Sequence, residues 1–100
     1  MNASDYQIKA LRTSDETDLN KSLINGVLGL SGEIGEVADI LKKHLFQGHN
    51  LDKSHMAEEL GDVCWYLAIT SNAIGYDLSE IMKMNIQKLK LRYPDGFDAD

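Results

Sequence analysis

Residue types that mark secreted or nucleic-acid-binding proteins are scarce in this chain. Its 100 residues include a single cysteine, Cys64, which cannot form an internal disulfide and therefore fits a reducing compartment. Because Cys64 lies in an apolar run, we expect a small buried side chain rather than a nucleophile. Lys and Arg number 10 against 16 Asp and Glu, and a net charge of −6 lacks the basic face that neutralises phosphates. We therefore expect no binding to long nucleic acid.

Long apolar runs are also missing. No stretch approaches the roughly 20 apolar residues of a membrane-spanning helix, and the polar, acidic residues 1–5 do not resemble a signal peptide. We expect a cytoplasmic protein that does not bind a membrane. Residues 1–100 are sufficient for one domain, with a loose tail expected from about residue 95. A chain this short buries only about 60–65% of its unfolded surface, so a partner copy would add considerably to its core.

Proline and strand-like alternation are rare, which favours an all-α fold resembling a four-helix bundle. Apolar residues recur at spacings of three and four, and capping signals divide them into helices. Ser4 and Asp77 each begin a capping-box pattern, at the starts of the first and fourth helices. Pro94, the only proline, ends the fourth helix. The predicted helices cover about residues 4–13, 21–46, 52–74 and 78–93.

Two patterns in the longer helices predict close packing. One apolar stripe follows the second helix through Leu23, Val27, Leu30, Ile34, Val37, Leu41 and Leu45. The same helix carries Gly26, Gly29, Gly32 and Gly35. Each mid-helix glycine costs about 0.8–1 kcal/mol relative to alanine, which predicts close approach of a backbone or ligand, or else a broken start over residues 26–32. Residues 63–69 of the third helix are apolar throughout, so that helix is either central or lies in a homodimer or homotetramer interface.

The most informative feature is a repeated acidic motif. The segment 33–41 is echoed by 59–67, and each copy reads acid, aliphatic, Gly, acid, Val and, at its end, Leu. On a helix, acids at i and i+3 project from one face. An antiparallel hairpin that turns near Gln47 and Gly48 brings both acid pairs to the same height. Single pairs of this kind are usually solvated, but both pairs lie at the matching edge of an apolar stripe, which favours a site.

Four carboxylates, two from each helix, then converge. Like charges at close range repel unless they take up protons or hold a cation. Oxygen ligands select a hard ion, so we expect Mg²⁺, with Mn²⁺ as a substitute. The predicted ligands are Glu33, Glu36, Glu59 and Asp62. Asp39 is a candidate outer ligand or ligand to a second ion, whereas Glu58 is expected on the surface.

With these acidic motifs, the chain resembles the MazG-like nucleotide pyrophosphohydrolases of the all-α NTP pyrophosphatase superfamily. Their signature, E-x-x-E followed after a spacer by E-x-x-D, matches residues 33–36 and 59–62. The resemblance also includes residues 29–33 before the first pair and the N-x-x-K-x-x-x-R pattern from Asn85 to Arg92. It covers about residues 23–97, and residues 6–13 resemble the opening helix of phage and bacterial members.

The resemblance implies Mg²⁺-dependent cleavage of a nucleoside triphosphate between its α and β phosphates, giving a monophosphate and pyrophosphate. Either Glu33 or Glu36 would orient the attacking water. The implied substrate contacts are Tyr66, Asn85, Lys88 and Arg92. For Tyr66 an ordinary core position is equally compatible, and exposed helix cations are often only solvated. Lys42 and Lys43 are weaker candidates near a helix end.

Other classes remain as alternatives. A di-iron bundle uses Glu-x-x-His motifs, and no Glu in this sequence has His three residues later. A non-catalytic helical oligomerisation or interaction module is the main rival, in which the acids merely border an interface. A dUTPase-like enzyme or a phosphoribosyl-ATP pyrophosphohydrolase would share the metal site with a different substrate. The three histidines lack a common helical spacing and are expected in loops and caps; they are His44, His49 and His55.

Overall fold

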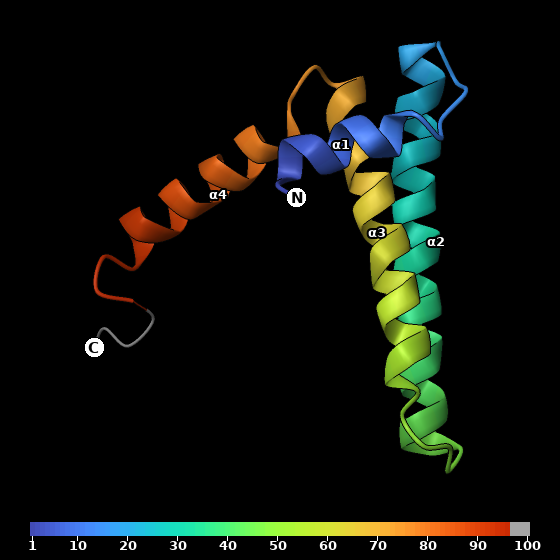
Figure 1. Ribbon diagram of the computed structural model, residues 1–100. Coiled ribbons are helices and arrows are strands. Elements are labelled where there is room, and N and C mark those ends of the chain that lie inside the picture. The colour runs from blue at the N-terminus through green and yellow to red at the C-terminus, as the bar shows by residue number, and fades with distance from the viewer. Residues whose placement is uncertain (97–100) are drawn as a thin grey trace.

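The computed structural model describes residues 1–96, and these form four α-helices without any strand (Figure 1). The helices are α1 (Ala3–Leu11), α2 (Leu19–Phe46), α3 (Lys53–Ala73) and α4 (Leu78–Arg92). The predicted all-α class and the four predicted helices are therefore confirmed. The loose tail expected from about residue 95 falls largely on residues 97–100, which lie outside the described part. Within residues 1–96, no helix is both long enough and apolar enough to span a bilayer.

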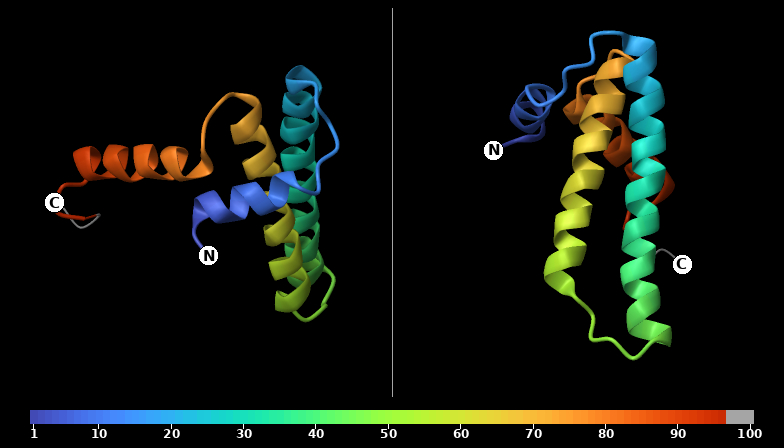
Figure 2. Two further views of the ribbon diagram at one scale, coloured as in Figure 1. Left: turned by 45° about the horizontal axis from the view of Figure 1, so that its top comes forward. Right: turned by 90° about the vertical axis from the view of Figure 1, so that its right-hand side faces the viewer.

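The two longest helices, α2 and α3, form an antiparallel hairpin (Figures 1 and 2). Asp18 caps α2, accepting hydrogen bonds from the backbone N–H groups of Asn20 (2.9 Å) and Lys21 (3.2 Å). From there α2 runs unbroken for 28 residues, so the broken start considered for residues 26–32 is wrong. The chain turns at Gly48, whose φ of 71° is in the left-handed region that favours glycine. Asp52 then caps α3.

Glycines set the spacing between α2 and α3. A Cβ atom added at Gly26 would collide with Thr70, and one added at Gly29 would collide with the ring of Tyr66. For Gly32 and Gly35, no atom of the described chain lies within 4 Å of an added Cβ. Close approach is thus confirmed for the first two glycines, whereas the next two face open space.

The first helix crosses α3 and is held there by Gln7 (Figure 1). The buried Gln7 side chain donates from Nε2 to the carbonyls of Ala68 (3.2 Å) and Tyr76 (3.3 Å). Its Oε1 accepts from the backbone N–H of Leu78 at 2.9 Å. The predicted capping box at Ser4 is wrong because Gln7 is used in these long-range bonds. Instead Asn2 caps α1, accepting from the Asp5 N–H at 2.8 Å.

The fourth helix leads away from the hairpin (Figure 2). It contacts α1 and α3, and among the described residues it does not contact α2. The predicted capping box at Asp77 is confirmed, because its side chain and that of Glu80 bond reciprocally to the backbone. The radius of gyration is 16.4 Å, against about 13 Å for an ordinary 100-residue domain, so one chain does not close into a compact bundle.

A single chain therefore buries a small core and leaves much apolar surface exposed. Within residues 1–96 the buried apolar side chains are Ala10, Ala68 and Ile69. In the predicted stripe of α2, Leu23, Leu30 and Val37 are half-buried, while Val27, Ile34, Leu41 and Leu45 are exposed. Cys64 is also exposed, contrary to expectation, because it lines an open pocket between α3 and residues of α1 and α4. Exposed apolar surface on this scale marks an interaction surface.

The contrast between the glycines yields a stability prediction. Gly29→Ala should lower the free energy of unfolding by about 1–3 kcal/mol, because the new methyl group overpacks against Tyr66. Gly32→Ala should raise it by about 0.5–1 kcal/mol, because alanine favours the helix and meets no neighbour. Urea unfolding followed by circular dichroism measures both. Equal effects of the two substitutions would contradict the close contact at Gly29.

Candidate functional site

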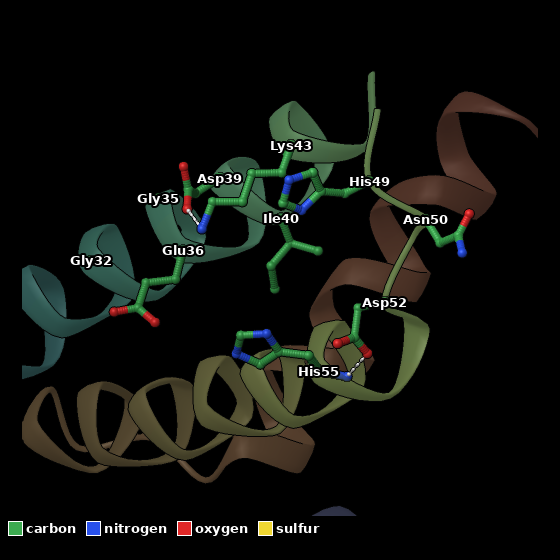
Figure 3. Close-up of a pocket in the computed structure, with 10 residues that line it drawn as sticks. All are labelled: Gly32, Gly35, Glu36, Asp39, Ile40, Lys43, His49, Asn50, Asp52 and His55. Atoms are coloured by element: carbon green, nitrogen blue, oxygen red, sulfur yellow. Dashed lines mark hydrogen bonds and ion pairs between the residues drawn. The ribbon is translucent and has the colours of Figure 1, made fainter. Parts of the chain in front are cut away.

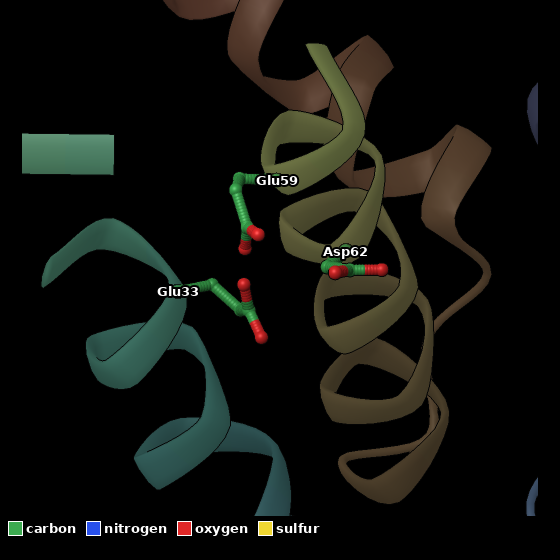
Figure 4. A group of neighbouring side chains, drawn as sticks. All are labelled: Glu33, Glu59 and Asp62. Carbon is green, nitrogen blue, oxygen red and sulfur yellow. The ribbon is translucent and has the colours of Figure 1, made fainter. Parts of the chain in front are cut away.

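Carboxylates from both helices of the hairpin meet near its middle. One carboxylate oxygen each from Glu33, Glu59 and Asp62 lie within 4.8 Å of one another. Figure 4 shows Glu33 of α2 and Glu59 of α3 pointing toward each other across the hairpin, with Asp62 on the next turn of α3. Glu33 and Glu59 are half-buried and Asp62 is exposed. The predicted convergence of acids thus holds for three residues, which we call the acid cluster.

The fourth predicted ligand, Glu36, lies at the rim of the acid cluster. It follows Glu33 by one turn of α2, is exposed, and is not among the three residues whose oxygens meet. Its charge is still felt within the cluster, since it contributes to the shifted pKa of Glu33. Glu36 also lines a cavity on the side toward the hairpin turn.

The acid cluster holds a proton in the absence of a cation. A hydrogen bond with Glu59, followed by burial and by the charges of Glu59, Asp62 and Glu36, raises the pKa of Glu33 to about 7. The same hydrogen bond is the largest cause that lowers the pKa of Glu59. Two carboxylates therefore share one proton, which Glu33 carries below about pH 7.

The cluster also contains an oxygen without a hydrogen-bond partner. Oε2 of Glu33 is enclosed, and nothing in residues 1–96 donates a hydrogen bond to it. A buried acceptor in this state is destabilising unless a donor or a cation satisfies it. Three carboxylates, one of which has an unsatisfied oxygen, therefore fit a hard divalent ion, to which Glu33, Glu59 and Asp62 could each offer one oxygen.

Two neighbours of the acid cluster were not identified from the sequence. Nε2 of His55 lies 3.3 Å from Oε1 of Glu59, so this histidine is more than the cap residue expected. Its i,i+4 spacing to Glu59 was the available signal. Tyr6 of α1 is the second: burial, and then the charges of Cys64 and Asp62, raise its pKa. This electrostatic influence joins distant parts of the chain, so no local sequence pattern indicates it.

The remaining candidates lie around the hairpin. The ring of Tyr66 packs against Gly29 and meets Trp65 edge-to-face at 5.0 Å, which gives it a packing role whatever else it contacts. Asp39 and Lys43 form an ion pair at 3.1 Å. Glu58 is exposed, as predicted.

The structure does not bring the basic candidates to the acid cluster within one chain. Asn85, Lys88 and Arg92 are exposed on α4, and α4 does not contact α2 in the described part of the molecule. Figure 1 shows α4 directed away from the hairpin. Any contact between these residues and a ligand at the acid cluster must therefore involve another copy or a different placement of α4.

Comparison with known proteins agrees with the arrangement of acids. The family model of the MazG nucleotide pyrophosphohydrolase domain matches residues 21–97. The match spans α2, α3 and α4, and it includes both acidic motifs.

A phage protein is similar over nearly the full length. The Gene 37 protein of Mycobacterium phage L5 is 32% identical, and the alignment covers 96% of this chain and 92% of the phage protein. No solved structure gives a significant match. By the extent of the family match and its agreement with the acid cluster, the chain belongs to the MazG nucleotide pyrophosphohydrolase family.

Proposed function

We propose that this protein is a metal-dependent nucleoside triphosphate pyrophosphohydrolase. It would cleave a triphosphate, preferably a deoxynucleotide, between the α and β phosphates to give a monophosphate and pyrophosphate. The observation that carries the proposal is the acid cluster, in which oxygens of Glu33, Glu59 and Asp62 lie within 4.8 Å of one another inside the matched domain. A cluster of this charge accepts a triphosphate only together with a cation.

We assign the cation as Mg²⁺, with Mn²⁺ as a substitute, held by the acid cluster with Glu36 at its rim. When bound, such an ion neutralises phosphate oxygens and makes the phosphorus easier to attack. Glu33 must release its proton to become a ligand, which couples ion binding to pH. Glu36 is exposed beside the three ligands, so we assign to it the orientation of the attacking water.

We further propose that the site is completed by a second copy of the chain. The helix α4 carries Lys83, Lys88, Lys90 and Arg92 against one acid, Glu80. Its apolar residues Met82, Ile86 and Leu89 are exposed, as are Ile34 and Leu60 beside the acidic motifs.

A homodimer, or a dimer of dimers, that packs α4 of one copy along the hairpin of the other would bury these apolar faces. It also brings Asn85, Lys88 and Arg92 to the phosphates bound at the acid cluster.

The reaction is tested by its products. Purified protein should release pyrophosphate, and not orthophosphate, from at least one member of a panel of ribo- and deoxynucleoside triphosphates, and only with Mg²⁺ or Mn²⁺ present. Orthophosphate with a diphosphate would mean attack at the γ phosphate and would contradict the assignment. No release from any nucleotide would favour the interaction-module alternative.

Neutralising single acids tests the site. Glu36→Gln and Asp62→Asn should each lower kcat by about 10²-fold or more while leaving the helical circular dichroism intact, because each removes transition-state stabilisation rather than packing. Glu58→Gln, which changes an exposed neighbouring acid outside the cluster, is the matched control and should keep full activity. Near-normal turnover in all of Glu33→Gln, Glu36→Gln, Glu59→Gln and Asp62→Asn would refute the metal site.

The raised pKa of Glu33 predicts how stability changes with pH. An unfolded glutamate loses its proton near pH 4.5, whereas folded Glu33 keeps it to about pH 7. The contribution of protonated Glu33 to the free energy of unfolding is therefore complete below pH 4.5, and it is lost as the pH rises through about 7. Metal-free protein should melt at a lower temperature at about pH 8 than at about pH 5, and Glu33→Gln should reduce that difference. Mg²⁺ affinity, measured by calorimetry, should rise over the same range, since the metal competes with the proton.

Mixing variants tests the shared site. Asp62→Asn and the double substitution Lys88→Ala/Arg92→Ala should each be strongly impaired at low substrate concentration. Refolded together in equal amounts, they should recover about a quarter of wild-type activity, because half of the random dimers contain one intact site. A mixture of Asp62→Asn with Glu36→Gln is the matched control and should recover nothing, since both changes lie on the hairpin. Absence of recovery in the first mixture, or a monomer by light scattering, would exclude the shared site.

A further inference from the structure

A cavity of about 640 Å³ lies next to the acid cluster, between the C-terminal half of α2 and the start of α3 (Figure 3). We call it the hairpin cavity. Glu36 belongs both to its lining and to the rim of the acid cluster, so the two sites are adjoining. Its volume lies within the range of about 300–1,000 Å³ that is usual for small-molecule sites. The metal chemistry of the acid cluster does not by itself account for this space.

One wall of the hairpin cavity is bare backbone. Gly32 and Gly35 of α2 line it, and within residues 1–96 a Cβ added at either position meets no atom within 4 Å beyond its own stretch of helix. Figure 3 shows Ile40 of α2 and His55 of α3 directed toward the space between the two helices. A glycine surface, an aliphatic side chain and an imidazole together form a slot suited to a flat heteroaromatic ring.

The charges of the lining decide against a phosphate chain as the occupant. Three carboxylates line the cavity, those of Glu36, Asp39 and Asp52. The one lysine among the ten lining residues is Lys43, and its Nζ is paired with Asp39 at 3.1 Å. His55 is likewise paired with Glu59. Two or three phosphate groups would therefore meet a lining of their own sign, and the acids that could together hold a neutralising cation, Glu33, Glu59 and Asp62, are not in this lining. An uncharged base and sugar would meet no such repulsion.

We infer that the hairpin cavity holds the base and sugar of the nucleotide substrate, while the phosphates lie over the adjoining acid cluster. Glu36, at the boundary, would then stand near the α phosphate. His49 and Asn50, at the end of the cavity near the hairpin turn, supply polar groups that distinguish one base edge from another. This inference rests on the proposed function, and it names the residues that determine base preference.

Filling the glycine wall tests the assignment. Gly35→Leu adds a side chain at the cavity wall, where the new Cβ has no neighbour outside its own stretch of helix within 4 Å, and leucine is a better helix former than glycine, so folding should be preserved. Gly61→Leu is the matched control, since Gly61 also has open space around it but lies on α3 outside the cavity. Gly32→Leu fills the same wall from the preceding turn and serves as a second test variant.

Binding is measured by calorimetry with two probes, each with Mg²⁺: non-hydrolysable α,β-imido deoxynucleoside triphosphates and inorganic pyrophosphate. Gly35→Leu and Gly32→Leu should weaken binding of the nucleotide analogues by about tenfold or more and leave pyrophosphate binding unchanged. Gly61→Leu should change neither. This binding pattern supports the assignment of the cavity. If the wild-type protein released no pyrophosphate from any triphosphate, that result would overturn the proposed reaction but not the assignment of the cavity.

Three outcomes overturn the assignment. Equal weakening of pyrophosphate and nucleotide binding would show that the cavity takes phosphates. Unchanged nucleotide binding in both test variants would show that the cavity is not used. Light scattering could show a smaller assembly for Gly35→Leu than for the wild-type protein. If nucleotide affinity fell only in variants whose assembly was also smaller, the cavity would belong to a subunit interface.

Discussion

The close contact between α2 and α3 at Gly29 is the constraint on which the site depends. Gly29 precedes Glu33 by one turn of α2, and Tyr66, whose ring lies against Gly29, follows Asp62 by one turn of α3. In an antiparallel hairpin this contact fixes the register at which Glu33 meets Glu59. Any side chain at Gly29 pushes the helices apart at the turn that adjoins the acid cluster. The absence of a side chain at Gly29 is therefore part of what positions the carboxylates.

The acid cluster is an unfavourable arrangement in the metal-free fold. Glu33 keeps a proton that an ordinary glutamate would lose, and its Oε2 is enclosed without a donor in the described residues. Under the proposed function, a divalent cation would take the place of the proton and remove both conditions. The close helix approach at Gly26 and Gly29 lies within two turns of Glu33, so it contributes to bringing the carboxylates of the two helices near each other.

The sequence predicted what depends on local spacing. Helix ends, the cap at Asp77 and the meeting of Glu33 with Glu59 follow from periodicities and a repeat that each helix carries within itself. It did not predict the role of Gln7, because Gln7 has a capping-box position by spacing but its partners are contributed by α3, the following turn and α4. Nor did the apolar stripe of α2 show which members one chain would cover, since stripes look alike whether a neighbouring helix comes from the same chain or another.

The position of Gln7 has a consequence for α4. Its amide bonds to Tyr76 and Leu78, which flank the cap of α4, so the first helix determines the direction in which the last one leaves the hairpin. Together with the hydrogen bond from Ser4 Oγ to Ser79 Oγ at 2.9 Å, this buried side chain joins α1 to the start of α4. Loss of the Gln7 side chain would loosen α4 on the rest of the molecule while leaving the hairpin and its carboxylates in place.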